Sequence, residues 1–223
     1  MKIAAIVIAI GVLCTGCKVE PPKPPLVETV AILPFDSESN DVNAPDIMQR
    51  LVYLAMKSSA YRVLDIDETN AKLAKAGIQD GGQLPAVDPV KLGKDLGVQA
   101  LLYGNVENFG YVNIGFYQEQ KVTLELAMVN VTDGQNLWQN SGTGATRNLT
   151  LDKKEAQNRL TAGLAKQLVD KLFDSPLEEE ACQATTKALA TLPGFRFAGF
   201  SADEKARAGF KRGAKNAIKG AIK

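Results

Sequence analysis

The apolar run Val30-Ala31-Ile32-Leu33, which ends at Pro34, is the feature that most restricts how this chain can fold. A continuous apolar run predicts a strand that is buried on both faces, as is typical of a parallel sheet with helices on each side. A strand with one wet face would instead alternate apolar and polar residues. A chain of 223 residues is long enough to build one such domain with a substantial core.

Three helices and a short second strand are predicted before the middle of the chain. Each helix has a proline or an acidic residue at its expected start, which is where these residues are favoured. The predicted boundaries are Pro45 with Asp46 for the first helix, 61–64 for the strand, Asp65 or Asp67 for the second helix, a loop at 79–87, and Asp88-Pro89 to Gly97 for the third helix.

A meander of three strands is predicted next. The first begins at 100–103, and Val122 to Met128 then alternates apolar and polar residues, which indicates a half-buried strand. A phase shift after Met128 predicts a β-bulge there. Asp133-Gly134 predicts a hairpin turn before the third strand, in which Trp138 is expected to pack against the core.

A final core helix is predicted from Asp152, because leucines recur there at i, i+4 spacing, at 160, 164, 168 and 172. The element order is then β-α-β-α-α-β-β-β-α. The expected fold class is α/β (α+β), with a single mixed β-sheet and flanking helices.

The N-terminus predicts export. Lys2 precedes an apolar run over 3–13, which is too short to span a bilayer but suits a signal peptide at residues 1–16. Thr15-Gly16 before Cys17 resembles the lipobox of bacterial lipoproteins, although Cys14 stands where that pattern prefers Leu. The resemblance implies that Cys17 is the lipidated first residue of the mature chain. The alternative is a cysteine that merely ends a cleaved signal peptide.

Residues 17–27 are predicted to form an acylated cysteine followed by a proline-rich stalk. Four prolines between 21 and 25 favour an extended polyproline conformation, which would hold a domain away from a membrane. Lys18 follows Cys17 in place of the aspartate that retains enterobacterial lipoproteins at the inner membrane. The outer membrane is therefore the expected location, with the domain facing the periplasm.

Three phrases carry a resemblance to a known family: VAILPFDSESND, LLYGNVENFGY and VTDGQNLWQNSG, which begin at residues 30, 101 and 131. Together they resemble a family of bacterial lipoproteins of unknown function that is represented in Neisseria. The resemblance covers roughly 26–174 and the segment 194–197. It implies a fold related to the TolB N-terminal domain and the CsgG periplasmic domain, and partners among envelope lipoproteins, including a CsgG-like one.

No catalytic constellation is found, so the chain is predicted not to be an enzyme and to need no cofactor. It contains no histidine, the commonest general base and metal ligand. The acidic loop at 36–46 departs from a calcium-binding loop, because Asp41 replaces the required glycine and Ile47 the bidentate glutamate. A solvated loop is the favoured interpretation. The remaining cysteine, Cys182, is expected to be a half-buried helix residue.

The C-terminus is basic. Residues 196–223 carry a net charge of +6, whereas 17–195 carry −6. Lys211, Lys215 and Lys219 recur at helical spacing beside Phe210, which indicates contact with an anionic membrane or an acidic partner. A frayed, solvated tail is the alternative. Nucleic acid is not an expected partner of an exported lipoprotein.

An aromatic cluster around the third strand, made of Tyr103, Phe109, Tyr111, Phe116 and Tyr117, is favoured as core and turn packing, with a contact surface as the alternative. The domains are expected at 28–175, for the α/β domain, and 176–223, for a helical extension with the basic tail. The function predicted is a lipid-anchored, non-catalytic adaptor of an envelope or secretion complex, which could also form a homo-oligomer. The alternative is a CsgG-like oligomeric secretion-channel subunit.

Overall fold

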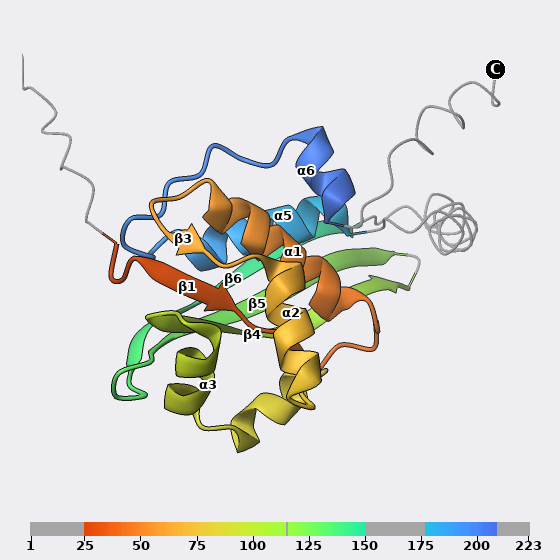
Figure 1. The fold of residues 1–223 in the computed structure, drawn as a ribbon. Coiled ribbons are helices and arrows are strands. Elements are labelled where there is room, and N and C mark those ends of the chain that lie inside the picture. Colours follow the sequence, from red (N-terminus) through yellow and green to blue (C-terminus); the bar gives the residue numbers. More distant parts are fainter. Residues whose placement is uncertain (1–24, 115, 150–176, 209–223) are drawn as a thin grey trace, which may run out of the picture.

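The computed structural model describes residues 25–114, 116–149 and 177–208, in which a six-stranded mixed sheet carries helices on both faces (Figure 1). The strand order is β3-β1-β4-β5-β6, and β2 pairs separately with β4. The strands are β1 (Thr29–Ile32), β2 (Asp36–Ser37), β3 (Arg62–Val63), β4 (Ala100–Asn113), β5 (Tyr117–Asn130) and β6 (Asn136–Leu149). The helices are α1 (Ala44–Lys57), α2 (Ile66–Lys75), the 3-10 helix η1 (Gly81–Ala86), α3 (Pro89–Leu96), α5 (Glu178–Leu189) and α6 (Ala202–Arg207).

Strand β1 is buried on both faces, which confirms the prediction from its apolar run. Val30 and Ile32 belong to the main core cluster, on the side of α1 and α5. Ala31 and Leu33 belong to the second cluster, with α2, η1 and α3. Parallel pairing with β3 on one side and β4 on the other makes β1 an interior strand. The predicted α/β fold with one mixed sheet is therefore confirmed.

Local start and stop signals place the helices where they were expected. Asp65 caps α2, accepting hydrogen bonds from the backbone N–H groups of Asp67 at 3.0 Å and Glu68 at 3.1 Å. Asp88 caps α3 in the same way, through the N–H of Val90 at 2.9 Å. Gly97 ends α3 in the left-handed conformation, with φ of +75°.

The predicted loop at 79–87 contains the helix η1, which was missed. Asp80 accepts a hydrogen bond from the N–H of Gly82 at 2.7 Å, and Gln83 Oε1 accepts from the N–H of Asp80 at 3.3 Å. This reciprocal capping box begins the turn. A proline and two glycines in six residues hide its helical character from a periodicity argument.

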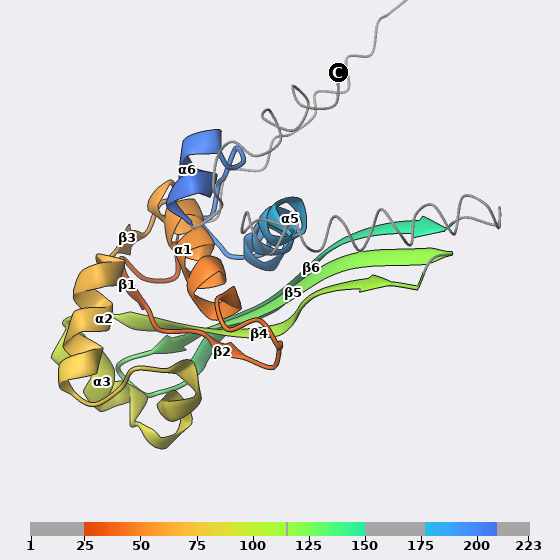
Figure 2. The ribbon, with the colours of Figure 1, turned by 90° about the vertical axis from the view of Figure 1, so that its right-hand side faces the viewer.

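The meander is confirmed, and its strands are long. β4, β5 and β6 each contain 14 residues. The pairing of β5 with β6 shifts register between Met128 and Val129, as predicted, and β4 has a second shift between Val106 and Asn108. Figure 2 shows the distal halves of these strands projecting beyond the described helices. We call this projection the arm.

Helix α5 packs on β6 and β5 and completes the main core. Ala181, Ala184 and Ala188 are fully buried on its sheet-facing side. The helix predicted from Asp152 lies outside the described residues. The domain boundary at residue 176 stays a prediction, but α5, which follows it, shares one core with the sheet.

Candidate functional site

The end of the arm carries the main group of exposed apolar side chains in the described residues. The described residues include six exposed large hydrophobic side chains, and four of these six lie at the end of the arm. We call these four the tip patch: Val112, Ile114, Phe116 and Leu149, with exposed fractions of 48, 55, 55 and 65%. Apolar groups gathered on a protruding element are typical of a contact surface for another macromolecule.

Strand register explains why residues distant in sequence meet in the tip patch. Tyr117, the first residue of β5, pairs with Leu149, the last residue of β6. Val112 of β4 pairs with Glu119, which lies on the same face of β5 as Tyr117 because side chains alternate along a strand. Ile114 and Phe116 belong to the turn between β4 and β5 and complete the patch.

A polar contact crosses the arm beside the tip patch. Arg147 Nε donates to Glu119 Oε1 at 2.6 Å, across directly paired positions of β6 and β5. Arg147 and then the hydroxyl of Tyr117, both hydrogen-bonded to Glu119, hold the pKa of the Glu119 carboxyl below its usual value. The hydrogen bond between Tyr117 and Glu119 raises the pKa of the Tyr117 hydroxyl. Because the Arg147 side chain is 64% exposed, this ion pair adds little to the stability of the fold.

The predicted aromatic cluster is divided by the structure. Phe109 is buried in the main core, and Tyr103 packs against the second core cluster on the other face of the sheet. Phe116 and Tyr117 lie at the tip of the arm, where Phe116 is exposed. Core packing is therefore confirmed for the first two residues, while Phe116 lies exposed in the turn.

The acidic loop at 36–46 is largely occupied by internal structure. Asp36 and Ser37 form β2, and Glu38 Oε1 accepts a hydrogen bond from Asn105 Nδ2 of β4 at 3.0 Å. Asp46 lies in the first turn of α1, where a negative charge is favourable. In the part of the chain that the structure describes, no three acidic, cysteine or histidine side chains come together to hold a metal ion.

Cys182 is half-buried in α5, as predicted. It lines a cavity of about 380 Å³ with Glu179, Phe200 and Lys205. Burial raises the pKa of its thiol to about 11. Thiolate is therefore scarce at neutral pH, and the thiol is a poor nucleophile there.

The predicted lipid anchor, Cys17, and the basic stripe of Phe210, Lys211, Lys215 and Lys219 lie outside the described residues. None of the helices in the described ranges is long and apolar enough to cross a bilayer. Of the tip patch, only Phe116 was singled out from the sequence. The missed signal is a group of apolar residues around 112–116 next to the polar run Gln118 to Lys121.

Comparison with known proteins identifies relatives. A family model described as GNA1162-like, a lipoprotein family, matches residues 22–193. The crystal structure of lipoprotein GNA1162 from Neisseria meningitidis is similar over 64% of this chain and 99% of that chain, with 20% identity and a TM-score of 0.51. The family resemblance drawn from the three sequence phrases is thereby confirmed.

Two further solved structures are more distantly similar. The PelC dodecamer from Paraburkholderia phytofirmans has 16% identity and a TM-score of 0.40, over 77% of this chain and 94% of that chain. LpoB from E. coli has 12% identity and a TM-score of 0.40, over 67% of this chain and 83% of that chain. A search of curated proteins finds no significant match.

Proposed function

Since this chain belongs to the GNA1162-like lipoprotein family, we propose that it is a lipid-anchored, non-catalytic adaptor that binds other envelope proteins through the arm. The anchor is the acylated Cys17, and the location is the periplasmic face of the outer membrane. The proline-rich stalk separates the domain from the bilayer. The observation that carries this proposal is the tip patch.

The tip patch is suited to protein binding because its exposure has no structural purpose within the described residues. Phe116 and Ile114 each keep more than half of their surface in water. Burying them against a partner would release that water and stabilise a complex, at roughly 25 cal/mol per Å² of apolar surface. The Glu119–Arg147 pair beside them offers a polar rim, as protein interfaces commonly have.

The alternative, a CsgG-like oligomeric secretion-channel subunit, draws on the length of the same strands. Strands of 14 residues exceed the ~9–11 that a membrane-crossing strand needs. In the arm, however, one face carries the charged residues Glu119, Lys121 and Arg147. The other face carries the polar residues Gln118, Gln120 and Asn148, so neither face is apolar as a lipid-facing surface must be. The adaptor is therefore favoured.

Crosslinking in cells tests the adaptor. The double variant Ile114→Ser/Phe116→Ser of the full chain is compared with Val42→Ser, which removes an apolar residue that is 88% exposed outside the tip patch. We expect wild type and Val42→Ser to capture the same partner proteins, and the double variant to lose most of them. Equal capture by all three would show that the tip patch is not the binding surface.

Two controls accompany this experiment. Palmitate labelling that is sensitive to globomycin and lost in Cys17→Ser tests the anchor. The native mass of the detergent-solubilised protein tests the alternative, because a channel subunit would form a ring of many copies, whereas an adaptor would form a small complex with a different protein.

A further inference from the structure

The point at which the chain enters the domain is covered by a segment from its other end. We call Pro25–Glu28, just before β1, the root, because the proposed stalk joins the domain there. We call residues 191–200, between α5 and α6, the strap. In Figure 1 the strap, in blue, passes beside the start of β1, in red.

A single buried hydroxyl group joins the root to the strap. Tyr61 Oη donates a hydrogen bond to the carbonyl oxygen of Pro193 at 2.6 Å and accepts one from the N–H of Leu26 at 3.3 Å. Tyr61 is only 4% exposed. Removing this hydroxyl would therefore leave the part-buried Pro193 carbonyl and the Leu26 N–H without this partner.

A direct backbone contact lies beside this hydrogen-bonded bridge. Gly194 has φ of +77°, a conformation that favours glycine. A Cβ atom added to Gly194 would lie 2.9 Å from both Cα and N of Pro25, closer than a Cβ atom approaches other heavy atoms in proteins. The root therefore rests directly on the backbone of the strap.

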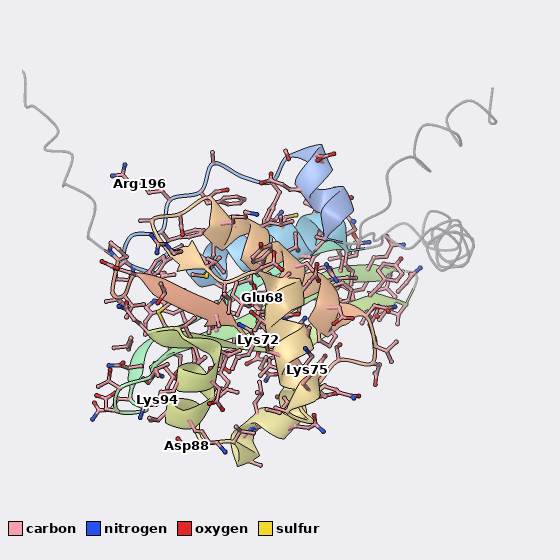
Figure 3. The ribbon with its side chains drawn as sticks, viewed as in Figure 1. Glu68, Lys72, Lys75, Asp88, Lys94 and Arg196 are labelled. Atoms are coloured by element: carbon pink, nitrogen blue, oxygen red, sulfur yellow. The ribbon has the colours of Figure 1, made fainter. Side chains whose placement is uncertain are left out.

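The strap is held in place independently of the root. Phe195, Phe197 and Phe200 pack against the main core, and the last two rings meet edge to face with centroids 4.6 Å apart. Arg196, which lies between Phe195 and Phe197 in the sequence, points away from the domain (Figure 3). At the start of the strap, Trp138 Nε1 donates to Thr191 Oγ1 at 3.1 Å.

We infer that the strap fixes the direction in which the stalk leaves the domain, and thereby sets the orientation of the arm relative to the membrane. This inference rests on the lipid anchor of the proposed function. Val30 of β1 pairs with Ala100, and β4 continues from there to Asn113, so the tip lies about 40 Å along the strand from the level of the root. A swivel of about 30° at the root would displace the tip by roughly 20 Å over that length.

Hydrogen exchange of the full chain tests the contact itself. Tyr61→Phe removes both hydrogen bonds and keeps the ring, and Gly194→Ala displaces Pro25. The matched control is Gly199→Ala, also in the strap, where φ is +108° and no atom lies within 4 Å of the added Cβ. Loss of one hydrogen bond is expected to speed exchange of the Leu26 amide roughly fivefold in the first two variants. Unchanged exchange in both would overturn the inference.

Energy transfer in vesicles tests the consequence. The acylated chain, with Cys182→Ser and a donor at Asn148→Cys near the tip, is reconstituted with acceptor lipids. Wild type and Gly199→Ala are expected to give one narrow distribution of tip-to-bilayer distances, whereas Tyr61→Phe and Gly194→Ala give a clearly broader one. Equal widths in all four would show that the strap does not orient the arm.

These results separate the inference from the proposed function. If wild type purified from membranes carries no acyl chain and fails to bind vesicles, the lipid anchor is wrong, and the exchange of Leu26 still decides whether the strap holds the root. If wild type binds and its distribution is as broad as those of the variants, the anchor stands and the strap inference falls.

Discussion

Gly142 of β6 lies against the backbone of Ala188 in α5, with no space between them for a side chain. A Cβ atom at position 142 would come within 2.9 Å of Ala188 Cα and closer still to Ala188 N. Backbone atoms cannot rotate away as the end of a flexible side chain can. The glycine therefore decides how deeply α5 sits on the sheet.

Gly142→Ala is expected to lower the free energy of unfolding by about 1–3 kcal/mol, because the added methyl group must push α5 away from β6. The control is Gly110→Ala in β4, where the nearest atom to an added Cβ is Asn108 Oδ1 at 3.6 Å. Its unfolding free energy is expected to stay within about 0.5 kcal/mol of wild type. Denaturant unfolding of the purified proteins measures both, and equal losses would contradict the close contact.

Asp65→Ala is expected to cost about 1 kcal/mol, because the side chain of Asp65 caps α2 through the N–H groups of Asp67 and Glu68. Asp67→Ala is the matched control, since Asp67 lies in the first turn and makes only an exposed ion pair with Arg50 at 3.7 Å. Thermal unfolding should separate the two variants. A larger loss in Asp67→Ala would mean that the capping residue has been misassigned.

Alkylation of Cys182 by iodoacetamide is expected to be about 10- to 100-fold slower at pH 8 than alkylation of an unperturbed thiol. Burial raises the pKa of this thiol from 9.0 to about 11, and the higher intrinsic reactivity of its thiolate offsets only part of the loss. The rate should rise with pH until about pH 11. Mass spectrometry follows the reaction, with Cys182→Ser as the blank.

The sign of the linked stability change follows from the same pKa. Between pH 9.0 and about pH 11 the thiol of Cys182 has lost its proton in the unfolded chain but retains it in the folded chain. The contribution of Cys182 to stability is therefore complete below pH 9 and falls as pH rises through this window. The difference in unfolding free energy between wild type and Cys182→Ser should therefore fall over this pH range. A difference that rises over the same range would contradict the burial of the thiol.

The pKa of Glu119 is expected below its usual 4.5, because Arg147 and Tyr117 hydrogen-bond its carboxylate. Arg147→Gln should raise the pKa of Glu119 more than Lys121→Gln does, since Lys121 contributes only a weaker charge interaction. A carbon-detected NMR titration of the carboxyl group measures each value. The Glu119–Arg147 pair stabilises the folded arm at pH values above the usual pKa of Glu119. This stabilisation is lost as pH falls through the lowered pKa of Glu119 in the folded protein.

Several elements could be predicted because their signals are local. Asp65, Asp88 and Gly97 act on backbone groups within a few residues, so their roles can be recognised from sequence alone. The bulge after Met128 shows as a change of phase within one strand. The element η1 was missed because its stability comes from the capping of Asp80 and Gln83 rather than from helical periodicity.

The candidate site was only partly predictable. Phe109 and Phe116 are both aromatic residues near one turn, yet one is buried and the other is 55% exposed. What separates them is how far the sheet extends beyond its described helices, which sequence spacing does not encode. Leu149 joins the tip patch through pairing with Tyr117, a contact between different strands.

The amino-acid sequence alone determined that β1 is interior, where α2 and α3 begin, and where the β5–β6 hairpin turns, since each depends on hydrophobic pattern or hydrogen bonds between near neighbours. Tertiary structure alone decided that α5 rests on Gly142, that four apolar residues meet at the tip of the arm, and that Tyr61 ties the root to the strap. These contacts join segments far apart in the chain, so they exist only once packing has brought those segments together.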